Sequence, residues 1–313
     1  MNFYDKNFRE VFGETLVELG AKYDNLMVLD ADLNTSTRTV LFKDRYPQRF
    51  LQCGIAESNM FGIAAGLAHM GFISFPTTFG AFAVRKALDQ VYMNICCQKL
   101  NVKIPGSYIG MTATECGPSH NVGEDIAVMR AMPYMRVIAP GDNNELRSAM
   151  YAMMEYDGPV YFRVPKFEAP ILFDDSYKFE WGKGIVLKKG KDITLMGTGM
   201  MTGICIKAAE LLDKDDISAE VIHMPSIKPI DEELIVKAAR KTGHIITIEN
   251  GRVIGGFGSA VCEVLSREYP VFVDMMGLGD DTFKSAPLGD LIIEYRLTHK
   301  NVAERAKALI VKK

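Results

Sequence analysis

The sequence lacks a bias toward either sign of charge, and it lacks long apolar runs. Its 36 Lys and Arg residues nearly balance 39 Asp and Glu residues, so the net charge is −3 and no basic stripe stands out. Nucleic-acid-binding proteins usually carry such a stripe, so we expect no nucleic-acid partner. The longest nearly uncharged run, 61–75, has 15 residues. A membrane-spanning helix needs ~20, so we also expect no membrane association.

Paired cysteines are also missing. The chain has six cysteines among 313 residues, and none of them forms a C-x-x-C pair or a zinc-site spacing. In a protein of this size they are typical of reduced thiols. The first residues alternate charged and apolar side chains and show no signal-peptide core. We therefore predict a cytoplasmic protein.

Two common kinds of site are incomplete in the sequence. The glycine-rich stretches at 197–199 and 255–258 complete neither a dinucleotide fingerprint nor a P-loop, so turn glycines explain them as well as phosphate binding does. His120, in a long loop over 110–120, is near neither a Ser/Asp triad partner nor a metal-spaced cysteine. Hydrolase and zinc chemistry therefore receive little support.

What the sequence does contain is typical of an ordinary globular α/β protein of about two domains. Its composition is 48% hydrophobic and 24% charged, and a helix with apolar residues at helical spacing opens the chain. Short apolar strands then alternate with helices, which predicts a mostly parallel sheet covered by helices on both faces. Strands are expected at 25–30, 71–76, 101–104, 136–140 and 160–164, a loop at 31–38, and helices at 57–69, 81–96, 123–131 and 143–156.

The segment 164–184 interrupts this rhythm with prolines, charges and five aromatic residues, and we interpret it as a linker packed onto a surface. A smaller α/β pattern follows it. Strands are expected at 193–196, 219–223, 244–248 and 271–274, and helices at 203–212, 231–241, 256–267 and 301–312. The predicted organisation is a first domain over 1–166, a linker over 167–183 and a second domain over 184–313.

Glu57 is the first candidate site residue. It begins a helix that runs almost without charge to 69, within the stretch GIAESNM. A glutamate there can simply complement the helix dipole, which contributes ~0.3–1 kcal/mol. Alternatively, apolar surroundings raise the pKa of the carboxyl group, and such a group can share a proton with a ligand nitrogen.

Two phenylalanines form the second candidate site. Phe79 and Phe82 follow the strand at 71–76, in the stretch TTFGAF. Aromatic residues at this spacing usually belong to a core. However, the carboxyl end of a strand in an α/β sheet is also where ligands bind, and an exposed ring there would stack on a flat heterocycle.

Taken together and in this order, these segments resemble the C-terminal half of a transketolase, and most closely the small subunit of the split, two-chain transketolases. The resemblance covers essentially the whole chain. It implies a pyrimidine-binding domain over 1–166 and a transketolase C-terminal domain over 184–313. The stretches that carry it are DADLNTSTR, RFLQCGIAESNM, FPTTFGAF, GPSHNVGEDIAVMR, VIAPGDNNEL, GPVYFR and IKPID.

The resemblance implies thiamine diphosphate as cofactor and assigns three residues to it. Glu57 matches the glutamate that contacts N1′ of the aminopyrimidine, and it is expected to promote the imino tautomer that activates the cofactor. Phe79 and Phe82 match the aromatic wall around the pyrimidine.

The resemblance also assigns the substrate residues. His120 matches the histidine that hydrogen-bonds the reacting end of the donor sugar, and it is expected to be catalytic. Arg38 and Lys166 fall where family members place cations for the sugar phosphate, although the alignment at Lys166 can shift onto Arg163. Two positions depart from the family: Cys116 replaces an aspartate, and Tyr108 replaces a histidine. We expect these departures to affect the choice of sugar.

A Gly-Asp-Gly…Asn motif, which holds the diphosphate and its Mg²⁺ in the N-terminal half of transketolases, does not occur in the sequence. The resemblance therefore implies a partner subunit with that motif, an α2β2 assembly, a site between chains and no metal ligands from this chain. The expected reaction transfers a two-carbon ketol unit from a ketose phosphate to an aldose. Three alternatives stay open: the β subunit of a 2-oxo acid dehydrogenase component, a deoxyxylulose-phosphate-synthase-like enzyme, and a non-catalytic regulatory subunit.

Overall fold

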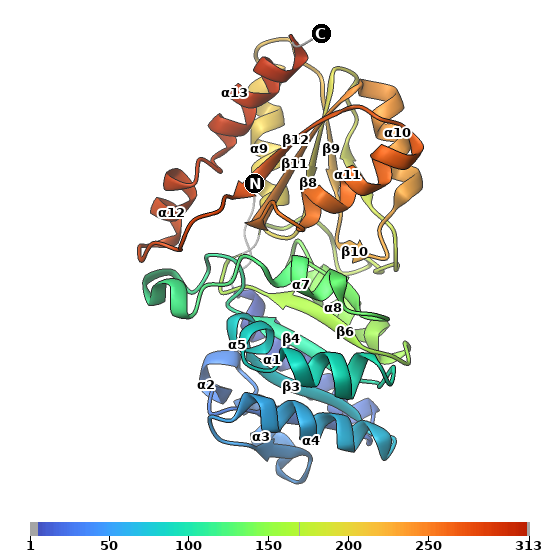
Figure 1. Ribbon diagram of the computed structural model, residues 1–313, viewed down its shortest axis with the longest axis vertical. Coiled ribbons are helices and arrows are strands. Elements are labelled where there is room, and N and C mark those ends of the chain that lie inside the picture. The colour runs from blue at the N-terminus through green and yellow to red at the C-terminus, as the bar shows by residue number, and fades with distance from the viewer. Residues whose placement is uncertain (1–5, 169, 312–313) are drawn as a thin grey trace.

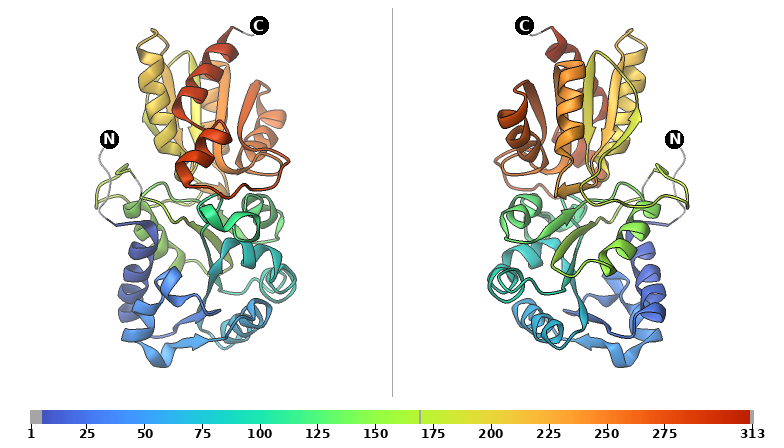
Figure 2. Two further views of the ribbon diagram at one scale, coloured as in Figure 1. Left: turned by 90° about the vertical axis from the view of Figure 1, so that its left-hand side faces the viewer. Right: turned by 90° about the vertical axis from the view of Figure 1, so that its right-hand side faces the viewer.

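Two β-sheets lie one beyond the other along the long axis of the molecule, and helices cover the faces of both (Figures 1 and 2). This computed structural model describes residues 6–168 and 170–311. The first half of the chain, blue to green in Figure 1, builds all but one edge strand of the larger sheet, and the second half builds that strand and the smaller sheet. None of the helices within the described ranges is long and apolar enough to cross a membrane.

The larger sheet is parallel except at one edge, in the strand order β10-β5-β6-β4-β3-β1-β2. Its central strands are buried along their whole length, as the continuous apolar runs of a parallel sheet require. The strands are β1 (Leu26–Asp30), β2 (Phe50–Gln52), β3 (Ile73–Phe79), β4 (Lys103–Ser107), β5 (Arg136–Ile138), β6 (Val160–Val164) and β10 (Ser226–Lys228).

Two hydrophobic cores lie on the two faces of this sheet. Successive side chains of a strand point to opposite faces, so Val28 joins one core and Leu29 the other. Helices α1 and α8 cover the Val28 face, and α4, α5 and α7 cover the Leu29 face. The helical segments of this half are α1 (Phe8–Lys22), α2 (Asn34–Thr37), α3 (Val40–Arg45), η1 (Pro47–Arg49), α4 (Glu57–His69), α5 (Gly80–Arg85), α6 (Leu88–Gln90), η2 (Val91–Cys96), η3 (Thr114–Ser119), α7 (Asp125–Ala131) and α8 (Asn143–Met154).

The single helix predicted over 81–96 is wrong, because the structure divides this segment into α5, α6 and the π-helical η2. Ala87, between the first two, has non-helical backbone angles. The carbonyl oxygen of the preceding residue, Lys86, accepts a hydrogen bond from the hydroxyl of Ser58 on α4 at 2.6 Å. This contact with another helix marks the break, and the break lies beside Glu57 in the candidate site.

The smaller sheet has the strand order β12-β11-β8-β9-β7, with β7 antiparallel to β9 and the other pairs parallel. Its long elements match the prediction closely, whereas β7 and α12 were not expected. The strands are β7 (Ile185–Lys188), β8 (Ile193–Gly197), β9 (Ala219–His223), β11 (His244–Arg252) and β12 (Phe272–Leu278), and the helices are α9 (Met201–Asp213), α10 (Glu232–Thr242), α11 (Phe257–Glu268), α12 (Leu288–Glu294) and α13 (His299–Ile310).

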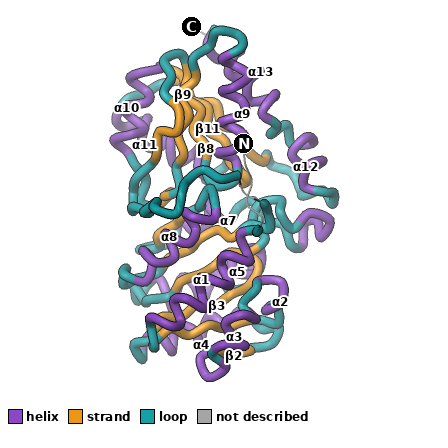
Figure 3. The backbone as a smooth tube through the Cα atoms, turned by 180° about the vertical axis from the view of Figure 1, so that it is seen from behind, coloured by secondary structure: helices purple, strands orange, loops and turns teal. Residues whose placement is uncertain are grey.

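The linker between β6 and β7 is mostly loop and packs onto the first sheet's helices, as its aromatic residues predict (Figure 3). Phe179 is buried against that core, and its ring lies edge-on to Trp181 at 5.1 Å. The two halves are also joined directly, since β10 pairs antiparallel with β5 although it follows the linker in sequence. A strand from the second half thus forms one edge of the first sheet.

Candidate active site

The candidate residues meet where β3 and β4 end at their carboxyl edge. Phe79 ends β3, Phe82 lies on the following helix α5, Tyr108 follows β4, and His120 lies in the loop before α7. Their rings form one cluster: the centroids of Phe79 and Phe82 are 5.6 Å apart, Phe79 and Tyr108 4.2 Å, and Phe82 and His120 5.2 Å. The fold therefore brings together residues that lie up to about forty positions apart in the chain.

Glu57 lies next to this cluster, as the first residue of α4 and only 5% exposed. Its carboxylate accepts a hydrogen bond from Nζ of Lys86 at 3.0 Å. The same ammonium group lies 4.1 Å from the centroid of the Phe82 ring. Sequence reasoning missed Lys86, because a lysine in a predicted helix is indistinguishable from an ordinary surface residue. A positively charged N–H donor thus bridges the carboxylate and the aromatic wall.

The loop that carries His120 is held by its own polar contacts. Nδ1 of His120 lies 2.7 Å from the hydroxyl of Ser119, which in turn donates to the carbonyl of Cys116. The side chain of Asn121 is buried, and its Oδ1 accepts a hydrogen bond from the backbone N–H of Ala113 at 3.0 Å. Cys116 is exposed on this loop. Because Nδ1 is engaged with Ser119, Nε2 is the ring nitrogen that we expect to meet a ligand.

Arg9 is a cation of the site that sequence reasoning missed. Its Nη1 donates to the phenol oxygen of Tyr108 at 2.6 Å and to the carbonyl of Ser36 at 2.7 Å. Nζ of Lys166 lies 5.6 Å from the centroid of the same Tyr108 ring. No carboxylate of the described residues forms an ion pair with Arg9, so its charge stays available. The only signal in the sequence was an arginine in the first turn of an amphipathic helix, which usually means a solvent-facing charge.

Two predicted cations lie in other environments. Arg38 has a left-handed backbone conformation and pairs with Glu10 of α1 at 3.4 Å. Arg163 is the alternative to Lys166 as the family's second cation. It is buried and donates two hydrogen bonds to Asp125 at 2.7 and 2.6 Å. It donates a third to the carbonyl of Asn250 in the second half of the chain. Three N–H groups of Arg163 are therefore committed to contacts within the protein, one of them to the second half, which favours Lys166 for the substrate.

The glycine-rich loop at 255–258 is occupied by a side chain of the protein itself. The carboxylate of Glu249 accepts the backbone N–H groups of Phe257 and Gly258, both at 2.9 Å, at the start of α11. Glu249 is fully buried, and this burial raises the pKa of its carboxyl group to about 7. An internal carboxylate thus takes the place that a phosphate would need, which favours the structural interpretation of these glycines.

Within residues 6–168 and 170–311, no group of three His, Cys, Asp or Glu side chains is placed to hold a metal ion. The polar side chains around the aromatic cluster include the Glu57 carboxylate, the His120 imidazole and the cations Arg9, Lys86 and Lys166. Such a set suits two ligands bound side by side, one with a basic ring nitrogen and one that is anionic.

Comparison with known families gives a match over each half of the chain. Residues 5–170 match the model of the transketolase pyrimidine binding domain. Residues 182–302 match the model of the transketolase C-terminal domain. Together the two matches cover nearly the whole sequence in the order that the resemblance predicted.

Individual proteins are similar over nearly the full chain. The 6-deoxy-6-sulfo-D-fructose transketolase subunit SqwH of Clostridium sp. (strain MSTE9) is 39% identical over 97% of this chain and 95% of its own length. A 1-deoxy-D-xylulose-5-phosphate synthase of Pelotomaculum thermopropionicum is 35% identical over 94% of this chain but only 47% of its own length. The solved structure of a split gene transketolase, an inactive beta4 tetramer, is 42% identical and superimposes with a TM-score of 0.91 over 97% of this chain and 98% of its own.

Proposed function

The chain belongs to the transketolase family, and we propose that it is the smaller subunit of a two-chain transketolase that transfers a two-carbon ketol unit from a ketose phosphate to an aldose. The observation that carries this proposal is the contact of Lys86 with both the Glu57 carboxylate and the Phe82 ring. A ligand in the place of the Lys86 ammonium group would need an N–H group toward the Glu57 carboxylate and a flat face toward the Phe82 ring. An aminopyrimidine ring has both.

The residues present fit the pyrimidine part of thiamine diphosphate. Glu57 would hold the proton at N1′, and Phe79 and Phe82 would form the wall beside the ring. When bound, the cofactor supplies the carbon nucleophile for ketol transfer. The carboxylate of Glu57 is buried, so a ligand nitrogen beside it would meet little competition from water.

The substrate side of the proposal rests on His120 and the cations around Tyr108. His120 would donate or accept a hydrogen bond at the reacting end of the donor through Nε2. Arg9 and Lys166 approach Tyr108 and would attract the phosphate group of the sugar. Arg38, whose charge Glu10 partly neutralises, is assigned a lesser share of this attraction. A non-catalytic subunit would not need this combination of carboxylate, imidazole and cations.

The diphosphate and Mg²⁺ are assigned to a partner subunit with the Gly-Asp-Gly…Asn motif, in an α2β2 assembly. A 1-deoxy-D-xylulose-5-phosphate synthase activity is the main competing activity, because several relatives carry that name. The test is to supply the two-chain complex with xylulose 5-phosphate or pyruvate and an aldose phosphate acceptor. We expect ketol transfer from the ketose without release of carbon dioxide. Release of carbon dioxide from pyruvate as the main reaction would refute the proposal.

Replacement of Lys86 with methionine is expected to tighten cofactor binding. Lys86 holds both groups that the pyrimidine would contact, so the ring must displace it. A half-exposed ion pair contributes ~0.2–1 kcal/mol, which corresponds to about 1.4- to fivefold tighter binding after its removal. Calorimetry of thiamine diphosphate with the two-chain complex measures this.

The matched control for Lys86 is Lys99→Met, because Nζ of Lys99 also lies 4.1 Å from an aromatic ring, that of Tyr134. We expect this variant to bind the cofactor like the wild type. Weaker binding by Lys86→Met would show that the lysine supports the cofactor instead of competing with it.

Replacement of Cys116 with aspartate is expected to increase selectivity among ketose donors. The family's aspartate accepts a hydrogen bond from a substrate hydroxyl. A thiol is a weak acceptor, so Cys116 loses most of the free energy of that hydrogen bond. Hydrogen bonds to charged groups contribute ~1.5–3 kcal/mol, so we expect the preference for xylulose 5-phosphate over its epimers to rise about tenfold or more. A donor panel with the two-chain complex measures the preference. If the wild type already discriminates strongly and the variant changes nothing, Cys116 does not determine specificity.

A further inference from the structure

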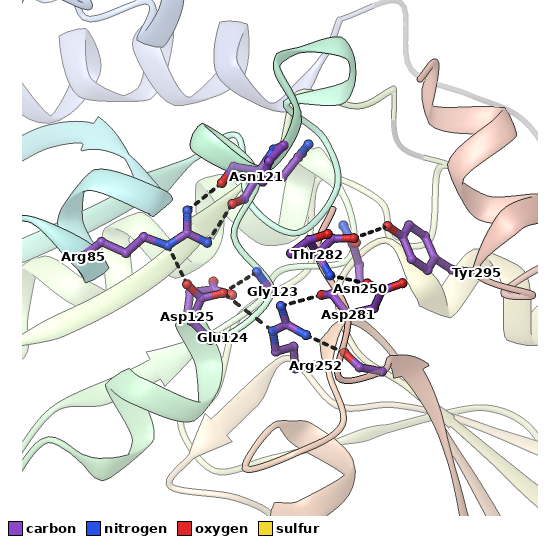
Figure 4. Close-up of polar contacts among 12 residues, drawn as sticks. Arg85, Asn121, Gly123, Glu124, Asp125, Asn250, Arg252, Asp281, Thr282 and Tyr295 are labelled. Carbon is purple, nitrogen blue, oxygen red and sulfur yellow. Dashed lines mark hydrogen bonds and ion pairs between the residues drawn. The ribbon is translucent and has the colours of Figure 1, made fainter. Parts of the chain in front are cut away.

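Arg85 donates hydrogen bonds to the backbone on both sides of His120. Figure 4 shows its guanidinium directed toward Asn121 and Glu124. Arg85 ends helix α5, and its Nη1 and Nη2 donate to the carbonyls of Pro118 at 2.8 Å and Asn121 at 3.0 Å. Its Nε donates to the carboxylate of Glu124 at 2.7 Å. One guanidinium group therefore fixes the two ends of the short segment that contains His120.

Helix α5 contacts His120 in two ways. Phe82 and Arg85 are three residues apart, so they lie on the same side of the helix. Phe82 meets the imidazole ring at 5.2 Å, and Arg85 meets the backbone that carries it. The distance between the aromatic wall and the imidazole is thus set within one short helix.

The second half of the chain supports the same loop from the other side. The backbone N–H of Arg252 donates to the carbonyl of Gly123 at 2.8 Å, and its guanidinium donates to the carbonyls of Gly279 and Asp281 (Figure 4). Gly117, at φ +65°, lies so close to the loop of Ser285 that a Cβ would come within 2.3 Å of its hydroxyl. The loop is therefore enclosed between α5 and the segment 279–285.

We propose that Arg85 is a positioning residue that sets the place of His120 against the aromatic wall, a role that rests on the function proposed above. Three of its five N–H groups are committed to the protein, which fits a clamp on the loop. Lysine cannot replace it, since a single ammonium group does not span two carbonyls and a carboxylate in one plane.

Arg85→Met in the two-chain complex is expected to lower kcat/KM by roughly ten- to a hundredfold, because small displacements of catalytic groups cost up to ~10² in rate. Cofactor affinity is expected to stay unchanged, and Arg85→Lys is expected to behave like Arg85→Met. Added to His120→Ala, the Arg85→Met change is expected to cause little further loss, because both act through the same imidazole. If Arg85→Met lowered kcat/KM by the same factor in the wild type and in His120→Ala, the proposal would be overturned.

The control is Arg49→Met, because Arg49 also donates to two backbone carbonyls, those of Tyr23 and Gly20, at 2.8 and 2.7 Å. We expect it to leave kcat/KM unchanged. A loss there as large as in Arg85→Met would overturn the specific role of Arg85.

Hydrogen exchange tests the clamp without turnover. The amides of His120 and Asn121 donate to the carbonyl of Gly117 at 3.2 and 3.0 Å, and we expect both to exchange at least tenfold faster in Arg85→Met than in the wild-type chain. Unchanged exchange would refute the clamp whatever the reaction. Faster exchange in a complex without ketol transfer would instead support the clamp and refute only the proposed function.

Discussion

Glu57→Gln is expected to abolish activation of thiamine diphosphate in the two-chain complex while the protein stays folded. The carboxylate is 5% exposed, and its ion pair in the structure is with Lys86, whose side chain is 47% exposed. Glutamine keeps the shape but cannot exchange a proton with N1′, and loss of such a group costs ~10²–10⁴ in rate. The rate of hydrogen–deuterium exchange at C2 of the bound cofactor measures activation directly. Glu57→Ala is expected to give the same result.

Glu220 offers a matched control for this experiment. It is 6% exposed and pairs with Lys241, whose side chain is 39% exposed, so its environment resembles that of Glu57. We expect Glu220→Gln to exchange the C2 hydrogen at the wild-type rate. Both variants are expected to lose less than ~1 kcal/mol in the free energy of unfolding, because ion pairs with half-exposed partners contribute little. C2 exchange at the wild-type rate in Glu57→Gln would remove Glu57 from the mechanism.

The isolated chain is expected to bind thiamine diphosphate at least about a hundredfold more weakly than the two-chain complex. The diphosphate carries most of the cofactor's charge, and a bound Mg²⁺ normally neutralises it. The sequence has no Gly-Asp-Gly…Asn motif, and the described part of the chain has no cluster suited to a metal ion. Titration calorimetry of the chain with cofactor and Mg²⁺, alone and after addition of the partner, measures the difference.

An open surface next to Glu57 fits this expectation. Ile55 is 75% exposed two residues before Glu57, and the positions where Gly62 and Gly66 on α4 would carry a Cβ have no atom within 4 Å. An open helix face with small residues allows close approach of another chain. Tight Mg²⁺-dependent binding by this chain alone would contradict the division of the site between subunits.

The long elements of the fold could be predicted because their patterns are long. Buried runs such as β1 and β9 and periodic helices such as α8 and α10 carry many residues of one pattern. The three- and four-residue strands β2, β7 and β10 carry too few residues for any period, and α2 within the expected loop at 31–38 is equally short. The break between α5 and α6 lies at a hydrogen bond from Ser58, 28 residues away, which no local pattern records.

In the candidate site, too, some residues could be predicted from sequence patterns and others could not. Glu57, Phe79, Phe82 and His120 were chosen from motifs, and the structure brings them to one edge of the sheet. The charged residues around them could not be chosen in this way, because a surface arginine and a clamping arginine look alike in sequence. Their separate roles come from three-dimensional contacts. Three such charged residues were missed: Arg9, Arg85 and Lys86.

The central claim is that this chain supplies the pyrimidine-binding half of an active site shared with a second polypeptide. The most direct measurement is ketol transfer from xylulose 5-phosphate to an aldose phosphate while this chain is titrated into a fixed amount of the subunit with the Gly-Asp-Gly…Asn motif, in excess thiamine diphosphate and Mg²⁺. We predict no transfer by either chain alone, a rise on mixing, and a plateau at equal amounts. Transfer by either chain alone, or none at any ratio, would contradict the claim.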